Sequence, residues 1–196
     1  MARFFFITLA MICVLGANGF FTQKSTWERM QASLEAQTNR RKSEEINPVL
    51  DMFDRIPLYD AKQSSTYKDG VASRAIDGNR DGQYHSGLSC THTDDNEDNV
   101  SWEAKMKSGS AQVAYVVISN RLDGYYNRIN GVKVFVDDQF CGAVEYLMGV
   151  ENYAVKCPPN TVGSVVRITG RNQVPLTLCE VRVLGNDSVC KCNSDE

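Results

Sequence analysis

Residues 113–136 read VAYVVISNRLDGYYNRINGVKVFV. The apolar run from Val113 to Ile118 has the composition of a buried β-strand, and Val132, Val134 and Val136 alternate with other residues as in a half-buried strand. The segment between the two runs is rich in Asn, Asp and Gly, the residues that favour turns. The stretch therefore predicts two β-strands joined by a loop.

The loop concentrates polar side chains. Arg121 and Arg128 carry guanidinium groups, which can donate paired hydrogen bonds to an oxygen-rich ligand. Asp123 lies between them and can orient one arginine through charge-assisted hydrogen bonds. Taken alone, the stretch is explained more simply by a surface ion pair on a loop. The choice between an ion pair and a ligand-binding site therefore depends on the rest of the chain.

The chain repeats this β pattern from about Leu58 onward. Short apolar runs are separated by Gly, Asn and Asp, at residues 113–118, 132–136, 143–146, 153–155, 165–168 and 176–184. No sustained helical pattern interrupts them. They predict an all-β fold, an antiparallel β-sandwich or jelly roll, in which Trp102 is expected to lie in the core.

Composition and the N-terminus limit the class of protein. The 196 residues carry a formal net charge of −3, and a pI near 5.5 argues against general nucleic-acid binding. Arg3, the apolar run from Phe4 to Leu15 and the small residues at 17–19 have the order of a secretory signal peptide. No later stretch reaches membrane-spanning length. We expect a secreted protein without membrane insertion.

A different segment precedes the β region. Trp27, Met30 and Leu34 recur at helical spacing among charged residues, which predicts a short amphipathic helix and a charged linker, ended by Pro48. The segment is either a solvated linker or propeptide, or a helix that binds a partner or makes the protein a homo-oligomer. The domain assignment is a signal peptide, a helical linker, the main β domain and a tail, at residues 1–19, 20–56, 57–186 and 187–196.

The cysteines indicate disulfides. Cys13 falls within the signal peptide, and the remaining even number indicates disulfides before metal ligands in an oxidising compartment. These cysteines are Cys90, Cys141, Cys157, Cys179, Cys190 and Cys192. Glycosylation sequons begin at Asn99 and Asn186, as suits a secreted chain.

An oxygen-rich turn, RAIDGNRDG, occupies residues 74–82. Asp77 and Asn79 could curl around a calcium ion, or the segment could be a turn held by Asx hydrogen bonds. His85 and His92 each stand alone, and no metalloprotease, nucleophile-elbow or Cys–His motif is present. A glycosidase carboxylate pair stays open but is not singled out by any spacing. We expect the protein not to be an enzyme.

In combination, these segments resemble the F-type lectins, a family of fucose-binding lectins with a discoidin-like β jelly roll. The resemblance covers about residues 57–186, in the order of the family. It is carried by residues 61–67 (AKQSSTY), 72–79 (ASRAIDGN), 90–93 (CTHT), Trp102, 120–123 (NRLD), Arg128 and 178–181 (LCEV). The resemblance implies a lectin whose partners are fucosylated glycans and glycoproteins.

The resemblance also implies a sugar-binding site. The family motif is a histidine, a spacer, and then Arg-x-Asp-x-x-x-x-Arg/Lys. Arg121, Asp123 and Arg128 match its second half, and His92 matches the histidine. The spacer is slightly longer here, and the acidic run after His92 is where a loop would absorb the insertion. His92, Arg121 and Arg128 are expected to donate hydrogen bonds to the sugar.

One wall of the predicted sugar site departs from the family. Many members have adjacent cysteines after Arg-x-Asp, where this chain has Gly124 and Tyr125. We expect Tyr125, together with Tyr84, to cover the apolar methyl group of fucose. The alternative is that these tyrosines are ordinary loop aromatics.

A structural calcium ion is the cofactor that the resemblance implies. Its ligands would be backbone or side-chain oxygens of Arg74, Asp77, Asn79, Ser89, Cys179 and Glu180. One residue more than usual lies between Asn79 and Ser89. The resemblance pairs Cys90 with Cys179, beside this site, and Cys141 with Cys157. Cys190 and Cys192 lie beyond the matched region and would bond to each other or to another chain.

The biological role has several candidates. The N-terminal layout resembles that of the bivalve sperm bindins, gamete-recognition proteins built on this lectin domain, and storage in secretory granules would suit fertilization. Innate immune recognition is the rival role for the same lectin. A discoidin-type membrane-binding adhesion domain is the alternative from another class, and it would need exposed apolar residues on its loops.

Overall fold

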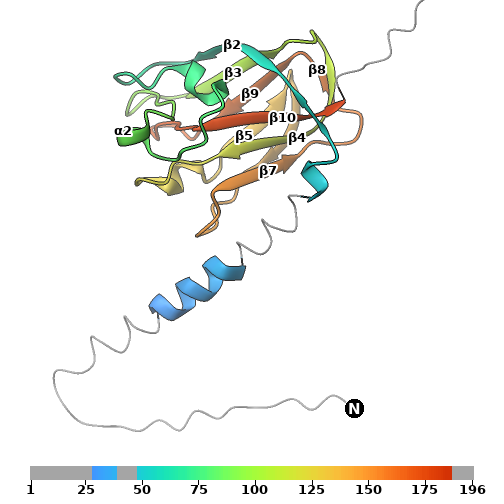
Figure 1. The fold of residues 1–196 in the computed structure, drawn as a ribbon. Coiled ribbons are helices and arrows are strands. Elements are labelled where there is room, and N and C mark those ends of the chain that lie inside the picture. Colours follow the sequence, from blue (N-terminus) through green and yellow to red (C-terminus); the bar gives the residue numbers. More distant parts are fainter. Residues whose placement is uncertain (1–27, 39–47, 187–196) are drawn as a thin grey trace, which may run out of the picture. The chain divides into compact units, whose positions relative to one another are not determined.

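The computed structural model describes residues 28–38 and 48–186 (Figure 1). Residues 28–38 form a helix, where the sequence predicts one, and Met30 and Leu34 are 54% and 60% exposed. Pro48 begins a single helical turn at residues 48–50. The predicted signal peptide, Trp27, the linker at 39–47 and the tail with Cys190 and Cys192 lie outside the described residues.

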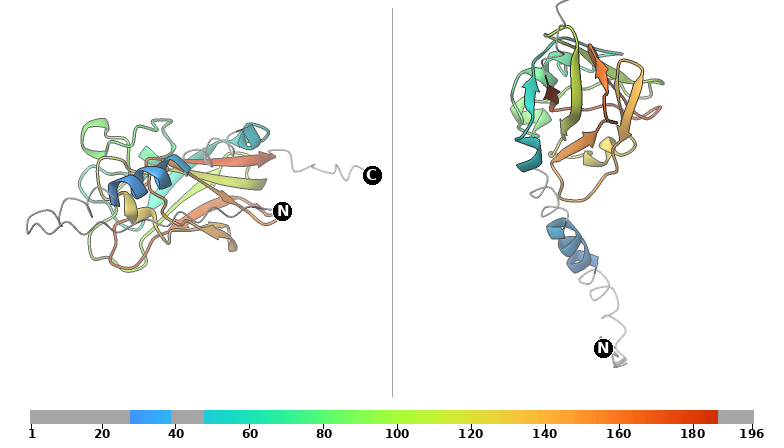
Figure 2. Two further views of the ribbon diagram at one scale, coloured as in Figure 1. Left: turned by 90° about the horizontal axis from the view of Figure 1, so that it is seen from below. Right: turned by 90° about the vertical axis from the view of Figure 1, so that its right-hand side faces the viewer.

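Residues 54–186 form two antiparallel β-sheets (Figures 1 and 2). The first has the strand order β1-β10-β4-β7, with β8 beside β4, at Asp54–Ile56, Glu180–Asn186, Ala111–Ser119, Asn152–Lys156 and Val162–Gly163. The second has the order β2-β3-β9-β5-β6, at Leu58–Gln63, Ser101–Met106, Val165–Thr169, Lys133–Val136 and Gln139–Ala143. The predicted all-β sandwich is confirmed.

Apolar side chains from both sheets share one core. Val134 and Val136 on β5 are fully buried, as their alternation predicts, and they pack with Ile118 of the opposite sheet in one cluster. Trp102 is 1% exposed, and its indole N–H donates to the Ala72 carbonyl at 2.9 Å. The prediction that Trp102 is a core residue is confirmed. Burying an aliphatic side chain such as that of Val134, Val136 or Ile118 contributes about 1.5–3 kcal/mol to folding.

Both predicted disulfides within the described residues are present. Cys90 bonds to Cys179 across 89 residues, and Cys141 bonds to Cys157 across 16 residues. In the chain-entropy model such loops stabilise the fold by roughly 4–5 and 3 kcal/mol. Cys141 lies in β6 and Cys157 directly follows β7, and these strands are edge strands of different sheets. The disulfide therefore links the two sheets at one edge.

Strands β2, β3 and β8 fall outside the predicted apolar runs, and the structure differs from the predictions at three further places. The sheet begins with β1 at Asp54, three residues before the expected start of the domain at 57. β6 ends at Ala143, so the apolar run 143–146 is not a strand. Only residues from Glu180 onward in the run 176–184 form β10, because the preceding Leu176 and Leu178 carbonyls accept instead from the backbone of Thr93 and Thr91. Within the described residues, no helix has the length and apolarity to cross a bilayer.

Short helices and loops gather at one end of the sandwich (Figure 1). The elements are η1 (Ala72–Ile76), α2 (Tyr84–Gly87) and η2 (Tyr126–Ile129). The backbone N–H of Leu122, just after β4, donates to the Gly82 carbonyl at 2.7 Å. This bond holds the loop of Arg121 and Asp123 against the turn that precedes α2.

Candidate functional site

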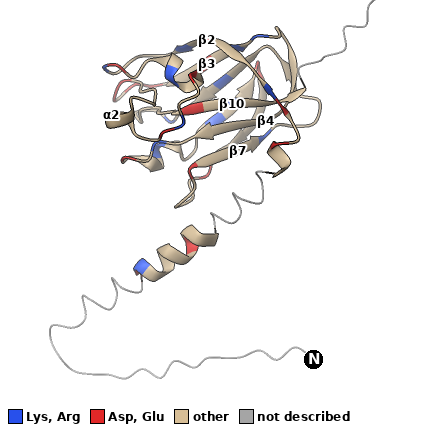
Figure 3. Cartoon of the chain, in the orientation of Figure 1, with Lys and Arg blue, Asp and Glu red and all other residues tan. Residues whose placement is uncertain are grey.

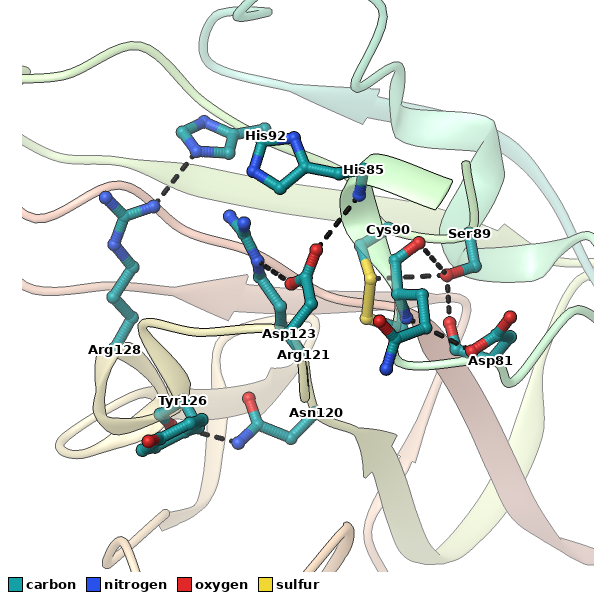
Figure 4. Close-up of polar contacts among 12 residues, drawn as sticks. Asp81, His85, Ser89, Cys90, His92, Asn120, Arg121, Asp123, Tyr126 and Arg128 are labelled. Atoms are coloured by element: carbon teal, nitrogen blue, oxygen red, sulfur yellow. Dashed lines mark hydrogen bonds and ion pairs between the residues drawn. A yellow bond between two sulfur atoms is a disulfide. The ribbon is translucent and has the colours of Figure 1, made fainter. Parts of the chain in front are cut away.

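Arg121 lies at the centre of a polar cluster (Figure 4). Its side chain is 2% exposed, and its Nε donates to Oδ1 of Asp123 at 2.5 Å. Its guanidinium carbon lies 4.6 Å from the centre of the Tyr84 ring and 5.4 Å from that of Tyr125. Aromatic faces attract a cation at such distances. The guanidinium is therefore held in one orientation, with its Nε committed to Asp123 and its terminal nitrogens left to meet a ligand.

Asp123 links the loop after β4 to α2. Its second oxygen, Oδ2, accepts from the backbone N–H of His85 at 3.0 Å. Burial opposes ionisation of the Asp123 carboxyl, but the hydrogen bonds from Arg121 and from His85 outweigh it and lower the pKa of this carboxyl. Asp123 is therefore a carboxylate at neutral pH, and it neutralises the Arg121 cation.

His92 is a buried, neutral imidazole. It is 4% exposed, its Nδ1 lies 2.6 Å from the Thr93 carbonyl, and its Nε2 lies 2.9 Å from Nη1 of Arg128. A carbonyl can only accept and a guanidinium can only donate, so Nδ1 carries the proton and Nε2 accepts. Burial, with the Arg128 and Arg121 cations, lowers the pKa of His92. In this state His92 is thus an acceptor at Nε2, in contrast to the donor role expected from the sequence.

Arg128 closes the cluster from the other side. Its guanidinium lies 4.3 Å from the centre of the Tyr125 ring, and its Nη2 lies 3.9 Å from Oδ1 of Asp95. Tyr125 is 62% exposed and has a left-handed backbone (φ 54°), next to Gly124 at φ 134°. A left-handed tyrosine is uncommon, and here it places the ring over both arginines.

Tyr84 and Tyr125 occupy different positions in the cluster. Tyr84 is 5% exposed, and its ring centre lies 5.1 Å from that of His92. Its hydroxyl is buried and has no hydrogen-bond partner among the described residues. Tyr84 therefore packs beneath Arg121 and His92, and Tyr125 is the ring that faces solvent.

The structure brings together all six residues of the predicted sugar site. They are Tyr84, His92, Arg121, Asp123, Tyr125 and Arg128. Together they offer guanidinium N–H donors, one imidazole acceptor and an exposed aromatic ring. This combination suits a neutral ligand that has several hydroxyl groups and a small apolar part.

Part of the predicted calcium-ligand set lies together in a second group, namely the turn at 77–79, Ser89 and the start of β10 at Glu180. The backbone N–H of Gly78 donates to Oε2 of Glu180 at 3.1 Å, so the turn at 77–79 meets the start of β10. The hydroxyl of Ser89 contacts the carbonyl of Asp81 and lies 3.3 Å from that of Gln83. The Cys90–Cys179 disulfide then joins the neighbours of Ser89 and Glu180.

Two features decide whether this second group suits a calcium ion. The predicted donors are hard oxygens, which calcium prefers, and only Asp77 and Glu180 among them are carboxylates. The described residues contain no group of three or more His, Cys, Asp or Glu side chains that could hold a metal. A set that depends on backbone and hydroxyl oxygens is compatible with that finding. The residues therefore fit a calcium ion by their chemistry.

Arg55 is an unpredicted member of this group. The start of β10 is red in Figure 3, the colour of acidic residues. Glu180 is the first residue of β10 and is fully buried, and its Oε1 accepts from Nη2 of Arg55 at 2.7 Å. Burial raises the pKa of the Glu180 carboxyl, opposed by the hydrogen bond from Gly78 and by the Arg55 cation. The Arg55 side chain is 48% exposed, so it can turn outward if a metal ion takes its place.

Sequence reasoning missed three contacts of these sites. Arg55 lies 125 residues from Glu180, and the backbone of His85 lies 38 residues from Asp123, so no local spacing signals either pair. Asp95, near Arg128, belongs to the acidic run after His92, where the sequence predicts a loop insertion. Its position shortly after His92 was the one available signal.

Comparison with known proteins finds similar curated proteins and similar solved structures, whereas no family model matches the chain. The chain is 33% identical to Fucolectin-3 of Anguilla japonica over 121 residues, which are 57% of this chain and 65% of that relative. It is 30% identical to Fucolectin of Anguilla anguilla, again over 121 residues, which are 57% of this chain and 75% of the relative. The chain thus spans just under two thirds of the length of the first of these.

Solved structures share the sandwich. An f-lectin (fucolectin) from the serum of Morone saxatilis (striped bass) has a TM-score of 0.59 and 30% identity, over 65% of this chain and 45% of that chain. A Streptococcus pneumoniae fucose binding module has a TM-score of 0.58 and 27% identity, over 67% and 95%. The lectin domain of lectinolysin, solved with the Lewis B antigen, has a TM-score of 0.55 and 30% identity, over 65% and 92%.

Proposed function

Because this chain belongs to the F-type lectin family, we propose that it binds terminal L-fucose on glycans through His92, Arg121 and Arg128. The observation that carries the proposal is the cluster itself, in which two guanidinium groups lie under the exposed ring of Tyr125 and one of them, Arg128, contacts the neutral imidazole of His92. The names of the relatives support it, since they are fucolectins and fucose-binding modules.

The chemistry of L-fucose matches the cluster. This 6-deoxy sugar presents hydroxyl groups, a ring oxygen and an apolar methyl group. Arg121 would donate from its terminal nitrogens to sugar oxygens, because its Nε is held by Asp123. Arg128 would turn its Nη1 from His92 to the sugar, and a sugar hydroxyl would then donate to the freed Nε2 of His92. The methyl group would lie against Tyr125.

Calorimetric titration with L-fucose tests this site. Hydrogen bonds to charged groups contribute about 1.5–3 kcal/mol each, so Arg121→Ala or Arg128→Ala should weaken binding roughly 10- to 150-fold. His92→Ala should also weaken it. Arg167→Ala is the matched control, because Arg167 lies on β9 and pairs with Asp138. If folded variants of all three cluster residues bind as tightly as the unchanged chain, the assignment is wrong.

A structural calcium ion belongs to the same proposal. Asp77, Ser89 and Glu180 would supply side-chain oxygens, and Arg74, Asn79 and Cys179 backbone oxygens. The ion would hold the turn at 77–79 against β10 and so support the loop of Arg121. Chelation should lower the melting temperature, and Asp77→Ala should reproduce the effect. An unchanged melting curve in chelator would remove calcium from the proposal.

The proposed setting is extracellular, and the proposed activity is binding without catalysis. Disulfides between Cys90 and Cys179 and between Cys141 and Cys157 suit an oxidising compartment, and one solved relative comes from serum. The relatives are lectins and binding modules, which supports recognition of glycans over turnover. Gamete recognition and innate immune recognition are the two candidate roles. Localisation in eggs, sperm or body fluid would separate them.

Multivalency would strengthen such a lectin, because one sugar site binds weakly. The helix at 28–38 carries Met30 and Leu34 on its exposed surface, and it is the proposed oligomerising element. Light scattering on the chain from residue 20 onward should report more than one copy. A monomer at every concentration under non-reducing conditions would contradict this.

A membrane-binding adhesion domain is the second candidate, favoured by exposed apolar residues on loops. Leu88 is 53% exposed and Tyr126 is 49% exposed. Tyr126 stacks with Tyr146, with ring centres 6.3 Å apart, so this ring is already engaged within the protein. Sedimentation with liposomes that lack glycolipids distinguishes the two, because only the membrane binder would sediment.

A further inference from the structure

A cavity of about 790 Å³ lies apart from the fucose cluster and is assigned no role above. None of the six sugar-site residues lines it. Its lining comes mainly from β7 and from the end of β6 with the segment that joins it to β7, and β4 and β10 add one residue each. Three of the lining residues are basic, Arg80, Lys156 and Arg182. Its size is that of pockets which hold drug-sized ligands or short saccharides.

The register of the first sheet places Arg182, Val117 and Ala154 on its outer face. Arg182 on β10 is directly opposite Val117 on β4, which is directly opposite Ala154 on β7. Directly opposed residues share a face of a sheet. Val117 and Ala154 pack with Leu50 in a small apolar cluster separate from the main core. The cavity thus has an apolar floor next to Arg182.

Lys156 and Arg80 complete the basic side of the cavity. Lys156 is directly opposite Tyr115, which packs on the same apolar cluster, so Lys156 also faces outward. Arg80 belongs to the oxygen-rich turn before α2 and is close enough to Arg182 for the two cations to repel each other. Both Arg80 and Lys156 are exposed.

Among the described residues, the Arg182 side chain has a buried nitrogen without an acceptor, Nε. Asp51 and Glu145 also line the cavity, but no ion pair forms between them and the three basic residues in the described part of the chain. The lining therefore has an excess of basic side chains and a buried N–H that lacks an acceptor, which a bound oxyanion would supply.

We propose that this cavity is a second binding site, for an oxyanion carried by an acidic saccharide. The anion is a sulfate or carboxylate group that accepts from Arg182, with Lys156 and Arg80 beside it. The apolar floor at Val117, Ala154 and Leu50 takes the sugar ring. This site is independent of fucose binding, so the chain would recognise two kinds of sugar on different surfaces.

Titration of the chain from residue 20 onward tests the proposal. The probes are a sulfated heparin disaccharide, sialyllactose, inorganic sulfate and neutral lactose, with calcium held constant. The sulfated or the sialylated saccharide should bind, lactose should not, and added salt should weaken the binding. The stronger of the two acidic saccharides identifies sulfate or carboxylate as the group. Binding of inorganic sulfate with neither saccharide overturns the saccharide assignment.

Variants locate the site. Arg182→Met should weaken binding of the acidic saccharide about tenfold or more and leave L-fucose affinity unchanged. Arg167→Met is the matched control, a half-buried strand arginine on the other sheet, and should change neither. If Arg182→Met does not fold, the exposed pair Arg80→Ala with Lys156→Ala replaces it. Failure of both acidic saccharides to bind at millimolar concentration, or equal binding by the folded variants, overturns the proposal.

Discussion

Asp123→Asn removes one charge from the centre of the fucose cluster while keeping the shape of the side chain. In the intact protein, Oδ1 accepts from Arg121 Nε at 2.5 Å and Oδ2 accepts from the His85 backbone at 3.0 Å. An asparagine has one acceptor oxygen, and its NH₂ group must then face a second donor. One of the two hydrogen bonds is therefore lost.

The magnitude follows from the burial of Arg121. The side chain of Arg121 is 2% exposed and that of Asp123 is 11% exposed, so the variant leaves a buried cation without its carboxylate. Breaking a buried pair in this way destabilises a protein by about 3–5 kcal/mol. For a domain of this size, we expect the melting temperature to fall by about 10 °C or more. L-Fucose affinity should fall as well, because Arg121 loses its fixed orientation.

Thermal melts followed by calorimetric titration measure both effects. Asp95→Asn is the control, because its carboxylate is 57% exposed, lies 3.9 Å from Arg128 and should contribute less than about 1 kcal/mol. The pKa of Asp123 is lowered in the folded state, so its contribution is complete above its unfolded pKa and is lost as pH falls through the folded value. The variant should lack that part of the acid sensitivity. A melting temperature within a degree or so of the unchanged chain would refute the account of Arg121 given above.

Three further predictions concern the surroundings of the site. Arg55→Met removes the cation that competes for Glu180, so calorimetry should show tighter calcium binding and thermal melts a less stable calcium-free protein; unchanged calcium affinity would count against that competition. The pKa of His92 lies below its usual 6.5, so L-fucose affinity and stability should be level above pH 6.5 and fall only at lower pH, and a titration series with loss above pH 6.5 would contradict a neutral imidazole. In Gly82→Ala the new Cβ would lie 2.4 Å from Cγ of Leu122, so the loops should separate and L-fucose affinity should drop; a folded variant with unchanged affinity would show that this contact is dispensable.

Local pattern was sufficient to predict the sandwich. The alternation of Val132, Val134 and Val136 reports which side of β5 faces the core, because side-chain direction in a strand has a period of two. The pairing of Arg121 with Asp123 was also predictable, since the two residues are near neighbours in sequence. The end of β6 at Ala143 was not predictable. Val144 is buried without being in a strand, and an apolar side chain indicates burial whatever the conformation of the backbone.

The remaining contacts depend on how distant segments meet. Tyr84 was expected to cover the methyl group of fucose together with Tyr125, but α2 turns it under Arg121 and His92, a position fixed by the fold as a whole. The same holds for Arg55, which reaches Glu180 because β1 pairs with β10. The acceptor role of His92 depends on the positions of the Thr93 carbonyl and Arg128, which no spacing in the sequence specifies.

The arrangement of Arg121 and Arg128 indicates how the proposed site would bind a neutral sugar. Arg121 is fixed before the ligand arrives, by Asp123 on one side and the Tyr84 ring on the other, so little side-chain entropy is lost when it donates to the sugar. Arg128 is held by the weaker set of contacts, a hydrogen bond to a neutral imidazole and an exposed tyrosine ring. In the proposed binding mode, that one hydrogen bond would be exchanged for bonds from Arg128 to the sugar and from the sugar to His92. The free energy of binding would thus come from pairing Arg128 and His92 with the sugar in place of each other, while Arg121 would set the orientation of the sugar.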